Sequence, residues 1–206
     1  MLRLYIGNKN YSSWSMRAWV LMRQAGIPFE EVKVPFDSFD AGSQFKTTMA
    51  RLSPVGRVPV LVDGGLAVWD SLAIAETLAE RFPDRFLWPA DPAARARARS
   101  LCAEMHAGFS ALRNLCPMNI EASLPEVGQR LWAEHASLRE DVERLVTLWR
   151  GQLAHQPEHG LLFGAFSIAD AFYAPVCMRL ATYALPLPAD AAAYAARVRQ
   201  LPAVRA

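Results

Sequence analysis

The feature that most constrains the fold is a change of texture near residue 82. Before it, short strand-like and helix-like patterns alternate, whereas long helical patterns follow one another after it. A chain of 206 residues is long enough for two small domains with buried cores. We therefore expect a mixed α/β domain over residues 1–82 and an all-helical domain over residues 89–206.

The first half has the order of elements that a thioredoxin-like layer requires. Strand patterns cover Leu2–Gly7, Phe29–Val34, Val58–Val62 and Leu66–Trp69. Helical patterns cover Ser15–Ala25 and Ser71–Phe82, with a helix or a loop in the segment before Val58. A βαβ start, a hairpin around Asp63-Gly64-Gly65 and a closing helix predict a thioredoxin-like fold.

The second half contains helical patterns and no convincing strand. They run over residues 92–115, 125–155, 167–183 and 189–200. Their apolar stripes, such as Leu101 with Met105 or Leu138 with Leu145, are typical of helices that pack into a core.

Composition excludes several classes of function. The 22 basic and 20 acidic residues leave a formal charge of +2 without the basic cluster that nucleic acid binding needs. No apolar run approaches the ~20 residues of a membrane span, and the N-terminus lacks the pattern of a signal peptide. Cys102, Cys116 and Cys177 are unclustered, which favours reduced cysteines in a cytoplasmic protein. The four histidines and the cysteines show no metal-binding spacing, so we expect no metal.

Pro59 is the first residue with chemical significance. It stands between Val58 and Val60 just ahead of the hairpin, where a proline removes a ladder donor. The local sequence alone favours a trans bond at the sheet edge, because only ~5% of X–Pro bonds are cis. A cis Val58–Pro59 bond would instead expose the backbone N–H and C=O of Val58 to a ligand.

Asp70 and Ser71 stand at the start of the helix expected over residues 71–82. Either residue would cap that helix well. The same free N–H groups and positive dipole could also hold a carboxylate, while Asp70 met an ammonium group. Together they would clamp the head of an α-amino acid.

A run of serines, Tyr11-Ser12-Ser13-Trp14-Ser15, lies between the first strand and the first helix. One of these serines is expected to cap the helix. The C-terminal edge of a parallel strand is also where open α/β sheets bind ligands. A serine hydroxyl and a helix N-terminus at that edge could stabilise a thiolate.

Taken in this order and spacing, the three segments resemble the glutathione transferase family. The motifs are Ser-Ser-x-Ser-x-Arg, then Arg-Val-Pro-Val-Leu, then Asp-Ser-Leu-Ala-Ile-Ala-Glu. They are most similar to the zeta class, maleylacetoacetate isomerase, and its less-characterised bacterial relatives. Ser167 and Asp170 resemble the family's helix-capping box, so the resemblance covers almost the whole chain.

The resemblance implies an enzyme that uses glutathione as a co-substrate. Ser12 matches the serine that stabilises the glutathione thiolate. Ser13 is the alternative and comes second, because it is nearer the helix and is expected to be occupied in capping it. The positions that match glutathione contacts are Val58, Asp70 and Ser71, with Lys46 and Arg57 as partners of the glycyl carboxylate. The second-substrate pocket is expected to include Trp14, Met105, His106, Phe109 and Arg179.

Two departures from the zeta pattern limit the analogy. Trp14 replaces the zeta cysteine, and Thr182 stands where zeta proteins have an arginine for the substrate carboxylate. Arg179 lies one helical turn earlier and could substitute for it.

The resulting hypothesis is a cytoplasmic, homodimeric glutathione transferase with a role in detoxification, which conjugates small electrophiles or reduces peroxides. The alternatives are a zeta-like isomerase and a transferase-fold protein that only binds ligands. Thiol–disulfide exchange is excluded because no cysteine precedes Cys102.

Overall fold

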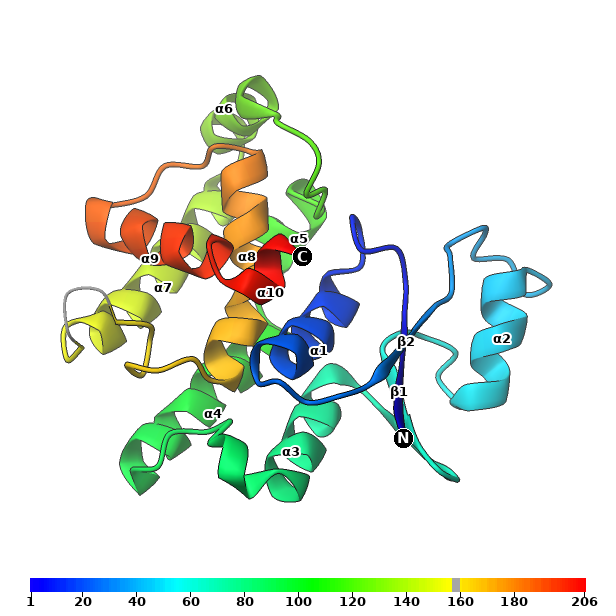
Figure 1. Ribbon diagram of the computed structural model, residues 1–206. Coiled ribbons are helices and arrows are strands. Elements are labelled where there is room, and N and C mark those ends of the chain that lie inside the picture. The colour runs from blue at the N-terminus through cyan, green and yellow to red at the C-terminus, as the bar shows by residue number, and fades with distance from the viewer. Residues whose placement is uncertain (157–159) are drawn as a thin grey trace.

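The first half of the chain is built on a four-stranded mixed sheet. The computed structural model describes residues 1–156 and 160–206, so His159, one of the four histidines, lies outside the described residues. The strands are β1 (Leu2–Ile6), β2 (Glu30–Lys33), β3 (Val60–Asp63) and β4 (Leu66–Trp69). Their order is β2-β1-β3-β4, with β1 parallel to β2 and β3 antiparallel to both neighbours (Figure 1). This arrangement confirms the expected thioredoxin-like layer.

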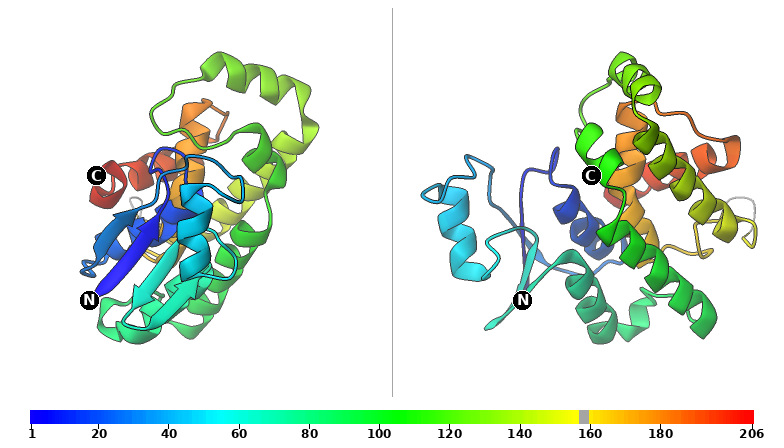
Figure 2. Two further views of the ribbon diagram at one scale, coloured as in Figure 1. Left: turned by 90° about the vertical axis from the view of Figure 1, so that its right-hand side faces the viewer. Right: turned by 180° about the vertical axis from the view of Figure 1, so that it is seen from behind.

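Three helices cover the sheet. They are α1 (Ser13–Gln24), α2 (Gln44–Leu52) and α3 (Ser71–Arg81). Helices α1 and α3 lie on one face of the sheet, and α2 lies on the other (Figures 1 and 2). The segment that could have been a helix or a loop therefore contains the helix α2, whose first backbone N–H groups bond to Asp37. Helix α1 begins two residues earlier than predicted, because Ser12 is its N-cap.

The second half is helical, as expected, but more finely divided. After a short 3₁₀ turn (Pro83–Arg85) come α4 (Pro92–Ala107), α5 (Ser110–Leu115), α6 (Pro125–Glu134), α7 (Ala136–Leu153), α8 (Ile168–Thr182), α9 (Ala189–Arg199) and α10 (Pro202–Arg205). In the described part of the chain after residue 86, only isolated bridges at residues 161–165 have strand-like pairing.

Two helices predicted as continuous are each broken, and an arginine stabilises each break. After α4 the chain turns at Gly108 and at Phe109, which has a positive φ of 58°. Arg113 donates hydrogen bonds to the backbone carbonyls of Met105, His106 and Gly108 at the end of α4. These bonds satisfy carbonyls that have no partner within a helix that ends.

The second break, between α6 and α7, is stabilised in the same way. Arg139 donates to the backbone carbonyls of Trp132 and Ala133 at the end of α6. Each arginine lies only a few residues beyond the break that it stabilises. The helical spacing of the apolar residues also continues across each break, so sequence reasoning does not detect the break.

Helix α8 lies at the centre of the helical half and joins it to the first half. Nearly all of its residues are buried, and it packs against α1, α4 and α9. Figure 1 shows α1 between the sheet and α8. Buried residues of both halves, such as Leu21 of α1 and Phe172 of α8, belong to one continuous hydrophobic core.

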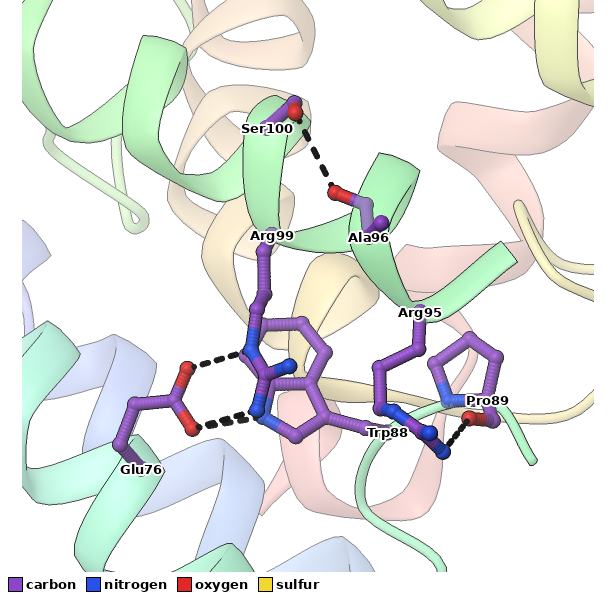
Figure 3. Close-up of polar contacts among 7 residues, drawn as sticks. All are labelled: Glu76, Trp88, Pro89, Arg95, Ala96, Arg99 and Ser100. Carbon is purple, nitrogen blue, oxygen red and sulfur yellow. Dashed lines mark hydrogen bonds and ion pairs between the residues drawn. The ribbon is translucent and has the colours of Figure 1, made fainter. Parts of the chain in front are cut away.

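Polar contacts of Glu76 fix the connection between the halves (Figure 3). Its carboxylate accepts hydrogen bonds from the indole of Trp88 at 3.0 Å and from the guanidinium of Arg99 at 2.9 and 3.2 Å. Arg95 donates to the backbone carbonyl of Pro89 at 3.2 Å. Helix α3, the linker and α4 are therefore held in one arrangement.

Among the described residues, no helix has the length and apolarity to cross a membrane.

Asp170 confirms the capping box expected at the start of α8. This fully buried carboxylate accepts hydrogen bonds from the backbone N–H groups of Leu162 and Ser167. It also accepts from the hydroxyl groups of Ser167 and Tyr194. Four donors from three segments thus depend on one side chain.

We predict that Asp170→Ala lowers the free energy of unfolding by about 3 kcal/mol, because it leaves several buried donors without an acceptor. Urea unfolding followed by circular dichroism measures the loss. The matched control is Asp190→Ala, which removes an exposed carboxylate paired with Arg150 and should cost less than about 1 kcal/mol. Equal losses in the two variants would contradict the role of Asp170.

Candidate functional site

An open pocket lies where the start of α1, the segment before β3 and the start of α3 meet. Its volume is about 340 Å³, and its lining residues are Trp14, Val55, Arg57, Val58, Pro59, Trp69, Asp70 and Ser71. The fold thus brings together parts of the three segments that the sequence singled out. Val55 and Trp69 are lining residues that the sequence analysis missed, because they stand in an ordinary loop pattern and an ordinary strand pattern, respectively.

The Val58–Pro59 bond is cis, as the motif implies. Strand β3 begins at Val60, after the proline, so Pro59 interrupts no ladder hydrogen bond within β3. Val58 and Pro59 form one wall of the pocket.

Asp70 and Ser71, at the start of α3, also line the pocket. Asp70 caps the helix by accepting a hydrogen bond from the backbone N–H of Leu72 at 2.8 Å. Its φ of 74° is unusual for a residue with a side chain, and such backbone strain is typical of functional sites. Ser71 is almost completely buried, and its hydroxyl lies 3.5 Å from the guanidinium of Arg17.

His106 of α4 reaches Asp70 across the boundary between the two halves. Its Nε2 lies 3.2 Å from the second carboxylate oxygen of Asp70, and its ring packs edge-on against Trp14. Burial lowers the pKa of His106, with Arg17 and Arg113 acting in the same direction and Asp70 opposing them. The neutral imidazole is therefore favoured at pH 7, and its Nε2–H donates to Asp70.

The two candidate serines have different roles from those expected. Ser12, not Ser13, caps α1: its hydroxyl accepts from the backbone N–H of Ser15 at 3.4 Å and donates to the Ser15 hydroxyl at 2.8 Å. The expectation that Ser13 would be the capping residue is therefore wrong. Ser13 is the first residue of the helix, and its hydroxyl oxygen accepts a hydrogen bond from Arg179 at 3.1 Å. The serine nearer the helix in sequence was expected to cap it, but the N-cap is the preceding residue, which has non-helical dihedral angles.

Three arginines surround this end of α1. Arg17 and Arg113 stack on Trp14, with 4.3 and 4.8 Å between the guanidinium carbon and the ring centroid. Burial, together with the nearby charge of Arg113, lowers the pKa of Arg17 to about 9 and that of Arg179 to about 10. Each arginine remains protonated at pH 7, so this part of the protein has a positive potential that favours an anion.

Arg17 had no assigned role in the sequence analysis, although a signal was present. It lies four residues after Ser13 and three after Trp14, and therefore on the same face of α1. A charged residue on a helix whose neighbours are buried indicates a specific environment.

The other predicted site residues are distributed unevenly. Arg57 lines the pocket, whereas Lys46 of α2 is not among its lining residues. Met105 and Phe109 are buried in the hydrophobic core. Arg179 is also buried, with 7% of its surface exposed. Thr182, at the place of the zeta arginine, is buried and donates to the backbone carbonyl of Asn119.

Comparisons with known proteins show which family the chain resembles. The family profiles described as the glutathione S-transferase N-terminal and C-terminal domains match residues 11–81 and 92–206. Glutathione S-transferase 1 of Dianthus caryophyllus is 32% identical over 177 residues, which cover 84% of this chain and 75% of the relative. Maleylacetoacetate isomerase of Rattus norvegicus is 33% identical over 125 residues, which cover 61% of this chain and 56% of the relative.

A solved structure extends the similarity to the whole chain. The theta class glutathione S-transferase of Xanthomonas axonopodis pv. citri, solved with glutathione bound, has a TM-score of 0.74 and 25% sequence identity. The superposition covers 99% of this chain and 95% of that one.

Proposed function

Because the chain belongs to the glutathione S-transferase family, we propose that it activates glutathione as a thiolate for transfer to small electrophiles or for peroxide reduction. Residues 1–82 would hold glutathione and residues 89–206 would hold the second substrate. The observation that carries this proposal is the pocket that unites the cis Val58–Pro59 segment, Asp70 with Ser71, and the start of α1.

The pocket has groups that suit each end of glutathione. The free N–H groups of α3 and the Ser71 hydroxyl suit the γ-glutamyl carboxylate, and the Asp70 carboxylate suits its ammonium group. The backbone of Val58 can pair with the cysteinyl part. Arg57, which also lines the pocket, can pair with the glycyl carboxylate.

We predict that Asp70→Ala and Ser71→Ala each weaken glutathione binding about tenfold or more, because each removes a charge-assisted partner worth roughly 1.5–3 kcal/mol. Isothermal titration calorimetry measures the dissociation constant. Asp84→Ala, at an exposed carboxylate near the linker, is the control and should bind glutathione like the unmodified protein. Wild-type affinity in both site variants would mean that Asp70 and Ser71 only cap the helix.

The sulfur of glutathione needs a donor that favours its ionised form, because the thiolate is the nucleophile. Its proton leaves to solvent, and the thiolate then forms a C–S bond with the electrophile as the leaving group departs with the bonding electron pair. We assign the donor to Ser13 in preference to Ser12. The Ser12 hydroxyl already donates to Ser15, whereas the Ser13 hydroxyl, among the described residues, only accepts a hydrogen bond and so keeps its proton for the sulfur.

Activation requires a moderate change of pKa. A free thiol has a pKa of about 8.5, and lowering it by one to two units requires about 1.4–2.7 kcal/mol. One hydrogen bond from Ser13, the N-terminus of the 12-residue helix α1 and the nearby guanidinium groups can supply that amount.

We predict that Ser13→Ala raises the apparent thiol pKa of bound glutathione by about one unit and slows turnover, with little change in glutathione affinity. The thiolate absorbance of bound glutathione as a function of pH measures the shift. Ser12→Ala is the matched control: it should lower the stability of the protein by about 1 kcal/mol through loss of the cap, with a smaller effect on the thiol pKa. The reverse pattern would return the role to Ser12.

Zeta-like isomerisation has less support than conjugation. The rat relative is a maleylacetoacetate isomerase, but Trp14 and Thr182 replace the cysteine and the arginine of the zeta pattern in this chain. The guanidinium groups of Arg17 and Arg113 both pack over the indole of Trp14, and the Thr182 hydroxyl donates to the backbone carbonyl of Asn119. Turnover of maleylacetone with glutathione would favour the isomerase.

We also propose that the protein is a cytoplasmic homodimer. Val55, Leu66 and Trp69 are large apolar residues with exposed side chains in the first half, and Val55 and Trp69 also line the pocket. Exposed large apolar residues of this kind are typical of an interface. Multi-angle light scattering at micromolar concentration should give about twice the chain mass of 22.9 kDa, and a value near 22.9 kDa would contradict the dimer.

A further inference from the structure

The guanidinium of Arg179 reaches from α8 in the second half to the first turn of α1. It donates hydrogen bonds to the backbone carbonyls of Arg113 and Cys116, and to the hydroxyl oxygen of Ser13 at 3.1 Å. Ser13 and Arg179 are 166 residues apart in sequence. Their bond is therefore a direct polar link between the two halves at the proposed activation site.

The chemistry of this bond fixes the direction of the Ser13 hydroxyl. An arginine has only donors, so the Ser13 oxygen must accept, and its own proton cannot point at Arg179. A hydroxyl that accepts from a cation is also a stronger donor to its next partner, because hydrogen bonds in a chain polarise one another. The remaining proton is therefore available to an acceptor at the start of α1.

The titratable neighbours of Arg179 in the described part of the chain are neutral or cationic. The titratable groups nearest to it are Cys116 and Tyr183, with Arg113 and Arg17 as the neighbouring cations. Burial raises the pKa of Cys116 to about 11 and also raises that of Tyr183, so both are neutral at pH 7. Among the described residues, no carboxylate forms an ion pair with Arg179.

A buried cation with only carbonyls and a hydroxyl as partners is costly unless an anion approaches. Such an anion could accept the remaining proton of the Ser13 hydroxyl, which lies at the start of α1 and is in contact with Arg179. A direct role for Arg179 in binding a substrate carboxylate fits less well, because its guanidinium is buried and already donates three hydrogen bonds.

We propose that Arg179 is a positioning residue for glutathione activation: it holds the Ser13 hydroxyl with its proton toward the sulfur and strengthens that hydrogen bond. This inference rests on the proposed function, in which Ser13 donates to the glutathione thiolate. Activation by the first half of the protein then depends on a side chain of the second half, through one hydrogen bond.

The test is a double-mutant cycle on the thiol pKa of bound glutathione, using Ser13→Ala, Arg179→Met and the double variant. Arg179→Met should raise the apparent pKa by about one unit, which is a tenfold fall in the ratio of thiolate to thiol at a given pH. Because Arg179 acts through Ser13, the double variant should differ little from Ser13→Ala alone. Arg179→Lys, which keeps a donor and the charge, should recover part of the shift.

Arg139→Met is the control, because Arg139 donates to backbone carbonyls at the α6–α7 break, whereas Arg179 also donates to Ser13. It should leave the thiol pKa unchanged. Full additivity of the shifts in the double variant would overturn the inference, since Arg179 would then act independently of Ser13. The inference would also be overturned if Ser13→Ala raised the thiol pKa of bound glutathione but Arg179→Met, shown to be folded by circular dichroism, left it unchanged. An unchanged pKa in both single variants would contradict the proposed function itself.

Discussion

The contact between α1 and α8 is the interaction on which the rest of the structure depends. Helix α1 packs with one side on the sheet and with another on α8, so it belongs to the cores of both halves. The Trp14 and Ser13 side chains at its N-terminal end are consequently held by groups from both halves. A site built at this point is rigid only if the two halves keep one arrangement, which the buried α1–α8 surface and the Glu76 contacts provide.

Buried positive charge is the second constraint. Arg17, Arg113 and Arg179 gather around one end of α1, and their hydrogen bonds go to carbonyl and hydroxyl oxygens. Such an arrangement stabilises the fold less than apolar residues of the same volume would. It does create a preorganised positive potential beside a helix N-terminus, which is what a bound anion needs. The electrostatics of the site thus make physical sense for a thiolate.

The sequence predicts the order of the elements because the two hydrophobic periods differ so clearly. The βαβ start, the hairpin at Gly64 and the capping box at Asp170 are local patterns, and each is found where it was expected. Pro59 and Asp70 were recognised because their residue types suit few other positions. The divisions of two long helices were missed, because Arg113 and Arg139 compensate for the breaks without disturbing the apolar period. The contact of Arg179 with Ser13 could not be read at all, since it depends on how α8 packs against α1.

The central claim, that the site binds glutathione in its thiolate form, is tested most directly by the protons released on binding. Calorimetry at pH 7 in two buffers with different ionisation enthalpies gives this number for glutathione and for S-methylglutathione, which has no thiol proton. If the bound thiol has a pKa near 6.5, glutathione should release roughly 0.7 proton more than its methylated analogue. Equal proton release by the two ligands would contradict the account, because the sulfur would then bind as a neutral thiol.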